Sequence, residues 1–288
     1  MKELLSPKQV ARAIGVSESS LKRWCDQGLI QAVRTAGGHR KLPLCDVIQF
    51  LREQQHKVVC PEALGLPVRS PHSEIGLDRG RDSFTDALIE GNESLARQIV
   101  FDLYLAKHPI CVICDRVICP AFQEIGRRWE CQSLDVYRER RGCEITHKIL
   151  YELRRKQPDP DPTRKACGGS LEGDSYTLPT TMADLVVRNA GWDTSSLGSG
   201  IPVESMVQAI RETKPELFWL CVSHIGDVER FVHDFKNLSE ATHTVGVAFA
   251  IGGRALTADL LTRIKFCCYC DSMQQLESFA CLVRQNQK

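Results

Sequence analysis

The chain has 288 residues, of which 43% are hydrophobic and 25% charged, so we expect a globular, soluble protein of two or three domains. No apolar run approaches the roughly 18 residues that a membrane-spanning helix needs, and the N-terminus has no apolar signal-peptide core. These features argue against a membrane partner and predict a cytoplasmic location. The fourteen cysteines are then expected to be thiols rather than a disulfide framework.

Residues 1–57 form a basic segment, with ten Lys or Arg against five Asp or Glu. The resulting net charge of +5, in a chain whose total is +1, favours an anionic partner, nucleic acid first. Ser6 and Pro7 can begin one helix, Gly15 supplies a turn, and Ser17 can cap a second helix. This spacing predicts a helix-turn-helix whose second helix enters the major groove. The alternative is a small helical domain with a solvated basic face.

A glycine-rich hairpin is predicted next, in "VRTAGGHRKLP" (33–43), and its basic flanks fit a wing that lies on DNA phosphates. With "SPKQVARAIGVSESSLKRW", this makes residues 4–53 resemble the winged-helix domain of the MerR family and related excisionase-type regulators. The resemblance implies DNA contacts from Ser19, Lys22 and Arg23 on the second helix and from Arg34, His39, Arg40 and Lys41 on the wing.

Two proline-containing segments divide the rest of the chain. Residues 58–82 show no sustained periodicity, and the prolines of "QPDPDPT" prevent a helix. We therefore predict a linker at 58–82, a helical bundle at 83–156, a second linker at 157–164 and a C-terminal domain at 165–288. In the bundle, apolar residues recur at steps of three and four.

The C-terminal domain alternates short apolar runs with helical stretches. Strands are predicted at 215–223 and 243–253 and before a polar turn near residue 171; helices are predicted near 179–190, 203–213, 227–240 and 272–285. This alternation predicts an α/β doubly wound parallel sheet, with ligands at the carboxyl ends of its strands.

The last two domains resemble those of cobalamin-dependent light-sensing MerR regulators. In "EIGRRWECQSLDVYRER" (124–140), Trp129 is followed after nine residues by Glu139 and Arg140, where those regulators have Glu-His. Their cobalamin-binding fold, shared with methionine synthase, carries Asp-x-His-x-x-Gly, Ser-x-Leu and Gly-Gly. The matching segments here are Asp174-Ser-Tyr176-Thr-Leu-Pro179, Ser223-His-Ile225 and Gly252-Gly253. The resemblance implies a multidomain chain of winged helix-turn-helix, four-helix bundle and flavodoxin-like α/β domain.

Three departures fall on positions that carry chemistry in that family. The resemblance implies that the loop His binds cobalt and that the preceding Asp orients it; Tyr176 offers a phenol instead, a poor ligand at neutral pH. Arg140 replaces the upper His and stays protonated, and Pro179 adds bulk where the family has Gly. We therefore expect a degenerate site and no cofactor, with residual cobalamin binding as the alternative. DNA binding should then neither require cobalamin nor respond to light. The site would consist of Trp129, Glu139, Arg140, Asp174, Tyr176, Ser223, Gly252 and Gly253.

No metal site is expected. His224 stands beside Ser223 and could reach a metal, but a His at a strand end is more often only hydrogen-bonded. Cys111 and Cys114 are three apart and fit one helical face, with Cys119 further on. A single C-x-x-C is a weak zinc or redox signal, so these cysteines, like those of "FCCYC" (266–270), are predicted to be small buried residues. A redox or haem-type role is the alternative.

The sequence therefore predicts a sequence-specific DNA-binding transcription regulator that is not an enzyme. Its expected partners are a double-stranded DNA operator and further copies of the chain, in a dimer or a larger homo-oligomer, with RNA polymerase a further candidate. One alternative is a regulator that still senses a corrinoid, a haem-like tetrapyrrole or redox state through non-standard ligands. The other is a corrinoid carrier protein for a methyltransferase, which would need the axial His and has no use for a winged helix.

Overall fold

The computed structural model describes residues 3–54, 56–67 and 76–286, and the chain forms two compact units. The first unit comprises residues 1–109 and 116–158, and the second comprises residues 110–115 and 159–288. Residues 68–75 of the predicted first linker lie outside the described residues. Among the helices that are described, none is long and apolar enough to cross a membrane.

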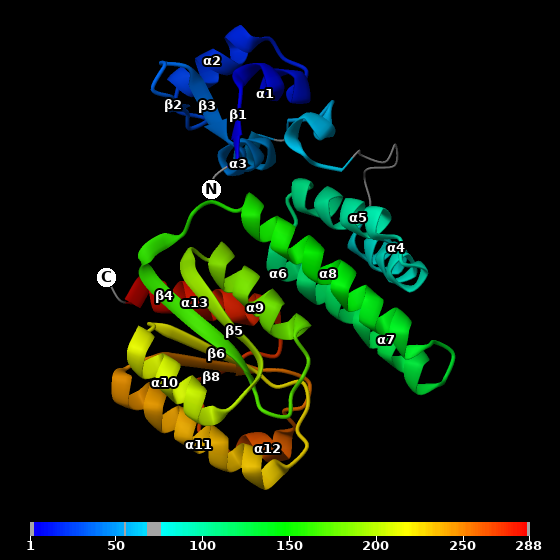
Figure 1. Cartoon of the computed structure of the whole chain (residues 1–288), viewed down its shortest axis with the longest axis vertical. Helices are drawn as coiled ribbons and strands as arrows, with labels where there is room; N and C mark the ends of the chain where they lie inside the picture. Colours follow the sequence, from blue (N-terminus) through cyan, green and yellow to red (C-terminus); the bar gives the residue numbers. More distant parts are fainter. Residues whose placement is uncertain (1–2, 55, 68–75, 287–288) are drawn as a thin grey trace. The chain divides into compact units, whose positions relative to one another are not determined.

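The first unit begins with the predicted winged helix-turn-helix (Figure 1). Its elements are β1 (Leu4–Leu5), α1 (Pro7–Ile14), α2 (Glu18–Asp26), β2 (Val33–Arg34), β3 (Arg40–Pro43) and α3 (Leu44–Gln54), with an antiparallel sheet of order β1-β3-β2. Ser6 and Gln9 form a capping box at the start of α1, and Gly15 ends α1 at φ +75°, a left-handed conformation that glycine adopts without steric cost. A 3-10 helix, Pro61–Leu64, follows α3 and packs on α1.

Four helices of the first unit form the bundle: α4 (Leu77–Glu90), α5 (Glu93–Leu105), α7 (Cys119–Glu130) and α8 (Val136–Lys156). Their apolar faces meet in a core that includes Phe84, Leu88, Ile99, Ile125 and Ile149. Helix α4 begins at Leu77, inside the segment predicted as linker. Its first turns, LDRGRD, are mostly polar and show no apolar periodicity from which a helix could be predicted. The short α6 (Ile110–Ile113) belongs to the second unit, and a π-helical turn, Cys114–Ile118, joins it to α7.

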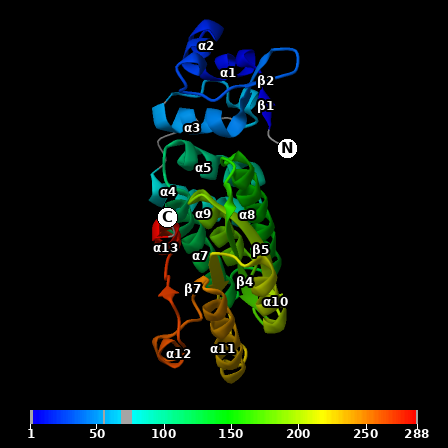
Figure 2. The same ribbon diagram turned by 90° about the vertical axis from the view of Figure 1, so that its left-hand side faces the viewer.

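The second unit is a five-stranded parallel sheet of order β5-β4-β6-β7-β8, which is the predicted flavodoxin-like topology. The strands are β4 (Asp161–Leu171), β5 (Trp192–Ile201), β6 (Leu217–Cys221), β7 (Ala248–Gly252) and β8 (Cys268–Tyr269). Helices α9 (Leu178–Asn189) and α13 (Met273–Asn286) cover one face, and α10 (Val203–Thr213) and α11 (Val228–Val245) cover the other (Figure 1, Figure 2). The short α12 (Ala258–Arg263) follows β7.

Three local features differ from the sequence prediction. Strand β4 starts at Asp161, within the Pro-rich segment, and its pairing with β5 is irregular between Asp161 and Lys165. Strand β5 was not predicted, because it is an edge strand whose residues 195–201 are mostly Ser and Gly and are exposed or half-buried. Residues 243–245 continue α11 rather than starting a strand, since the helix ends only at Gly246, with φ +78°.

The core on the α9 and α13 face is organised around two tryptophans. The Trp219 indole donates to Thr180 Oγ1 (3.1 Å), and the Trp192 indole donates to the Ala280 carbonyl (3.2 Å). A Cβ on Gly168 of β4 would overlap the ring and the carbonyl oxygen of Trp219. Glycine at this position therefore leaves room for a large ring between the central strands and α9.

Candidate functional site

The outer side of α2 carries the predicted recognition residues. Ser17 caps the helix by accepting the Ser20 amide (3.1 Å), while Leu21 is fully buried and Trp24 packs on Phe50 with ring centroids 5.1 Å apart. These inward contacts fix which face of α2 is left open. That face presents the exposed residues Ser19, Lys22 and Arg23.

The wing is a hairpin of β2 and β3, closed by Thr35 and His39 and turned at Gly38, with φ +78°. Arg34 and His39 are exposed and Lys41 is half-buried. Arg40 differs from its expected role as a free phosphate contact, because its guanidinium donates to Asp26 Oδ1 (2.6 Å) and to the Lys22 carbonyl (3.4 Å). It therefore ties the wing to the end of α2, so its loss would affect the position of the wing as well as its charge.

At the carboxyl edge of the sheet, Asp174 clamps two loops together. Its side chain is buried, with 3% exposed, and accepts three backbone amides. Oδ1 accepts the Tyr176 amide (3.1 Å), and Oδ2 accepts those of Ser223 (2.6 Å) and His224 (3.3 Å). The loop after β4 is thereby fixed to the loop after β6, which is the location where open α/β sheets bind ligands.

Tyr176 and the Gly252-Gly253 pair complete this edge. The Arg254 guanidinium lies over the Tyr176 ring, 5.0 Å from its centroid, and its Nε donates to the Ser223 carbonyl (3.3 Å). A Cβ on Gly253, whose φ is +135°, would overlap the backbone of Val222. The glycine pair therefore lets the end of β7 fold against the end of β6. Sequence reasoning missed Arg254, although its position directly after Gly-Gly at a strand end was an available signal.

Pro179 stands in the first turn of α9, a position that tolerates proline because the amide there has no helical partner. It therefore fits the helix that follows the loop. Beside the Asp174 clamp lies a cavity of about 220 Å³, whose lining includes His224, Asp227 and Arg230. Its volume suits a group the size of a side chain rather than a whole macrocycle. Arg230 forms ion pairs with Glu172 and, at 3.7 Å, with Asp234. These three charged side chains of the cavity wall therefore pair with one another.

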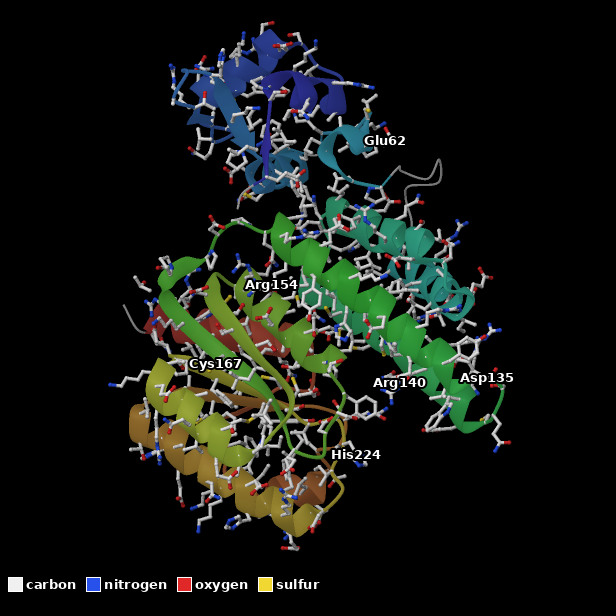
Figure 3. All side chains as sticks on the ribbon, in the orientation of Figure 1. Glu62, Asp135, Arg140, Arg154, Cys167 and His224 are labelled. Carbon is white, nitrogen blue, oxygen red and sulfur yellow. The ribbon has the colours of Figure 1, made fainter. Side chains whose placement is uncertain are left out.

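The α7–α8 end of the bundle carries the predicted cap residues. Trp129 of α7 is 48% exposed, and Val136 and Tyr137 at the start of α8 are also exposed. Arg140 is exposed on α8 (Figure 3). Its Nε lies 3.4 Å from Glu139 Oε2, so the Glu139 carboxylate forms an ion pair within its own helix. Three large apolar side chains in solvent at one end of a bundle are typical of a surface that covers a partner or ligand.

Half of the cysteines in the two predicted clusters are buried as predicted: Cys111, Cys114 and Cys270 are buried, whereas Cys119 and Cys268 are half-buried and Cys267 is exposed. Cys111 and Cys114 are enclosed, and the Cys111 thiol donates to Glu277 Oε2 (2.9 Å). Cys268 and Cys270 have their sulfur atoms 3.7 Å apart, and Cys267 is exposed. Within the part of the chain that the structure describes, no group of three or more His, Cys, Asp or Glu could hold a metal ion.

We expect buried and exposed cysteines of this chain to differ in their rate of alkylation at neutral pH. Burial raises the pKa of Cys111, Cys143 and Cys270 to about 12, with further contributions from neighbouring carboxylates or thiols. Their thiolate fraction falls by roughly a thousandfold relative to an ordinary thiol. Exposed Cys131 and Cys267 should therefore be alkylated by iodoacetamide first, as measured by peptide mass spectrometry, with the urea-unfolded chain as control. Equal rates for Cys111 and Cys131 in the folded chain would contradict this.

Two family models match the chain: a helix-turn-helix domain at residues 4–55 and a B12 binding domain at residues 81–154. Trimethylamine corrinoid protein 1 of Methanosarcina acetivorans is 20% identical over 183 residues, covering 62% of this chain and 85% of that protein. The HTH-type transcriptional repressor CarH of Myxococcus xanthus is 24% identical over 156 residues, covering 54% of this chain and 52% of the repressor.

Among solved structures, the monomethylamine corrinoid protein of Methanosarcina barkeri has the same fold. Its TM-score is 0.58 at 14% identity, over 72% of this chain and all of that protein. The sequence predictions of a helix-turn-helix domain, a helical bundle and a cobalamin-binding-like α/β domain are thus confirmed.

The expectation that the chain has no cofactor is wrong. The match of residues 81–154 to a B12 binding domain, and the likeness to corrinoid proteins and to CarH, point to cobalamin. The expectation that DNA binding neither requires cobalamin nor responds to light rested on the same reasoning and stays an untested prediction. Tyr176 and Arg140 change which side chains could bind cobalt, but Asp174 still holds the loops after β4 and β6 together at the ligand edge of the sheet.

Proposed function

We propose that this chain is a sequence-specific DNA-binding transcription regulator whose C-terminal half binds a corrinoid and alters DNA binding in response. The observation that carries the proposal is the pairing, in one chain, of a basic recognition helix left open on α2 with a segment that matches a B12 binding domain. The likeness to CarH supports the same combination. A corrinoid would supply a cobalt centre that exchanges ligands, and this chain's residues would hold it.

Each unit carries residues that we propose to contact a corrinoid. On the bundle they are Trp129, Glu139 and Arg140, which offer an exposed indole and a paired carboxylate and guanidinium. On the α/β unit they are Asp174, Tyr176, Ser223, Gly252 and Gly253, on loops that the Asp174 clamp holds together. The proposed DNA contacts remain Ser19, Lys22, Arg23, Arg34, His39 and Lys41, with Arg40 positioning the wing.

A methyltransferase corrinoid carrier is the rival function, supported by the likeness to the trimethylamine corrinoid protein. The domain at residues 4–55 favours the regulator, since a carrier has no evident need for it. The raised pKa of the buried thiols gives no support to a redox sensor, because thiolate is the reactive form.

The test is to purify the chain with and without hydroxocobalamin or adenosylcobalamin and to measure binding to a duplex selected by the chain from a random-sequence pool. Expected results are a bound corrinoid spectrum after desalting and a change of about fivefold or more in DNA affinity. A spectrum without any change in DNA affinity would favour the carrier. Absence of both corrinoid binding and selected DNA would refute the proposal.

We expect the regulator to bind its operator as a dimer or larger homo-oligomer. One winged helix reads a half-site, and specific affinity usually requires two half-sites on the same duplex. Analytical ultracentrifugation of the full chain, free and on the selected duplex, should therefore show at least two copies per duplex. A strict monomer in both states would contradict this expectation.

A further inference from the structure

His224 brings an imidazole to the carboxyl edge of the sheet, directly after the Ser223 of the Asp174 clamp. Its side chain, labelled in Figure 3, is exposed. The residue also lines the 220 Å³ cavity. No hydrogen bond or ion pair to its ring is present among residues 3–54, 56–67 and 76–286. The sequence expectation that a strand-end His is only hydrogen-bonded therefore does not describe this ring.

The backbone of His224 is fixed although its ring is open. Its amide donates to Asp174 Oδ2 (3.3 Å), and that oxygen also accepts the Ser223 amide (2.6 Å). The same carboxylate holds the Tyr176 amide (3.1 Å), so positions 176 and 224 are joined through one buried group. The clamp therefore fixes where the backbone of His224 lies, while its ring nitrogens stay open at the ligand edge of the sheet.

The two side chains on this clamp differ in what they can offer cobalt. Tyr176 has the Arg254 guanidinium over its ring and presents a phenol, whereas His224 presents a nitrogen donor of the kind that suits cobalt. The other imidazoles on this unit lie on α11, where His233 lies 3.3 Å from the Asn237 amide and His243 stands in the last turn. His224 is therefore the imidazole that the clamp itself presents at the ligand edge.

We propose that His224 supplies the protein's nitrogen ligand to the cobalt of a bound corrinoid, in the role that Tyr176 cannot take. This inference rests on the proposed corrinoid binding and adds the identity of the residue that binds the metal. It assigns the ligand to the loop after β6 instead of the loop after β4, within the same Asp174 clamp.

The probe is cobinamide, a corrinoid that lacks the nucleotide base. Any nitrogen that binds its cobalt in addition to those of the corrin ring must therefore come from the protein. The full chain is loaded with cobinamide, reduced to the Co(II) form, and examined by electron paramagnetic resonance. Wild type should show the triplet splitting of one nitrogen ligand, and growth on ¹⁵N-histidine should turn the triplet into a doublet. His224→Ala should lose the splitting and bind cobinamide about tenfold or more weakly.

His233→Ala is the matched control, because it removes another imidazole from the same unit and should leave the splitting unchanged. His224→Gln is the second variant, and circular dichroism should show that both His224 variants fold, as expected for an exposed side chain. Splitting that persists in both His224 variants, or wild type that binds cobinamide without nitrogen splitting, would overturn the inference. If wild type binds neither cobinamide nor hydroxocobalamin, the proposed function itself fails.

Discussion

Replacing Lys22 and Arg23 together by alanine is expected to weaken binding of the full chain to its selected duplex by about tenfold to several hundredfold. Both side chains are exposed on α2, on the side opposite the buried Leu21. A good contact to a base edge contributes about 1–3 kcal/mol of discrimination, and a phosphate contact adds about 0.9 to the slope of log affinity against log salt. Fluorescence anisotropy over a salt series measures both quantities.

The salt series also separates the two kinds of contact. If Lys22 and Arg23 bind phosphates, affinity for selected and unrelated duplexes should fall together and the salt slope should decrease by about two. If they read bases, only the selected duplex should lose affinity. The matched control is Lys236→Ala with Lys265→Ala, which removes the same charge from exposed positions on the other unit. Equal losses in the control and in the α2 variant would contradict the assignment of α2 as the recognition helix.

Replacing Asp174 by alanine is expected to destabilise the α/β unit by about 3–5 kcal/mol. The carboxylate is buried and accepts the amides of Tyr176, Ser223 and His224, so its removal leaves three donors without their partner. An unsatisfied buried donor costs about 1–3 kcal/mol, and water that enters the loop offsets part of the sum. Urea unfolding gives the free energy of unfolding, and hydrogen exchange of the loops after β4 and β6 should show lost protection.

Asp271→Ala is the control for this prediction, since Asp271 is exposed in the same unit and its change should stay within about 0.5 kcal/mol. Asp174→Asn should give an intermediate loss, because its amide oxygen can still accept while its NH₂ group faces a donor. If Asp174→Ala unfolds at the same urea concentration as wild type, the clamp does not hold the loops. Corrinoid binding measured on the folded variant should also weaken, because His224 and Tyr176 would no longer be held together.

The absence of His at positions 140 and 176 does not exclude a corrinoid. A large ligand contacts several loops, and its affinity is spread over many contacts. Most of that framework remains, as shown by the Asp174 clamp, the Gly252-Gly253 turn and the exposed Trp129. The absence of these two imidazoles changes the chemistry at cobalt more than it changes the shape of the loops.

Features that depend on neighbours along the chain could be predicted before the fold was known. The Ser6 capping box, the Ser17 cap and the left-handed Gly15 act within a few residues, so the helix-turn-helix could be predicted from them. The alternation of apolar runs and helices likewise determined the doubly wound sheet, because its periodicity is local.

Contacts between groups that are distant in the chain became apparent only from the folded protein. Arg40 turns to Asp26 across 14 residues, and Asp174 holds the amide of His224 across 50 residues. Arg254 covers Tyr176, and α6 joins the second unit although the helices on either side of it belong to the first. These contacts depend on how the loops at the strand ends and the packed helices come together, and no local periodicity or propensity encodes that pairing.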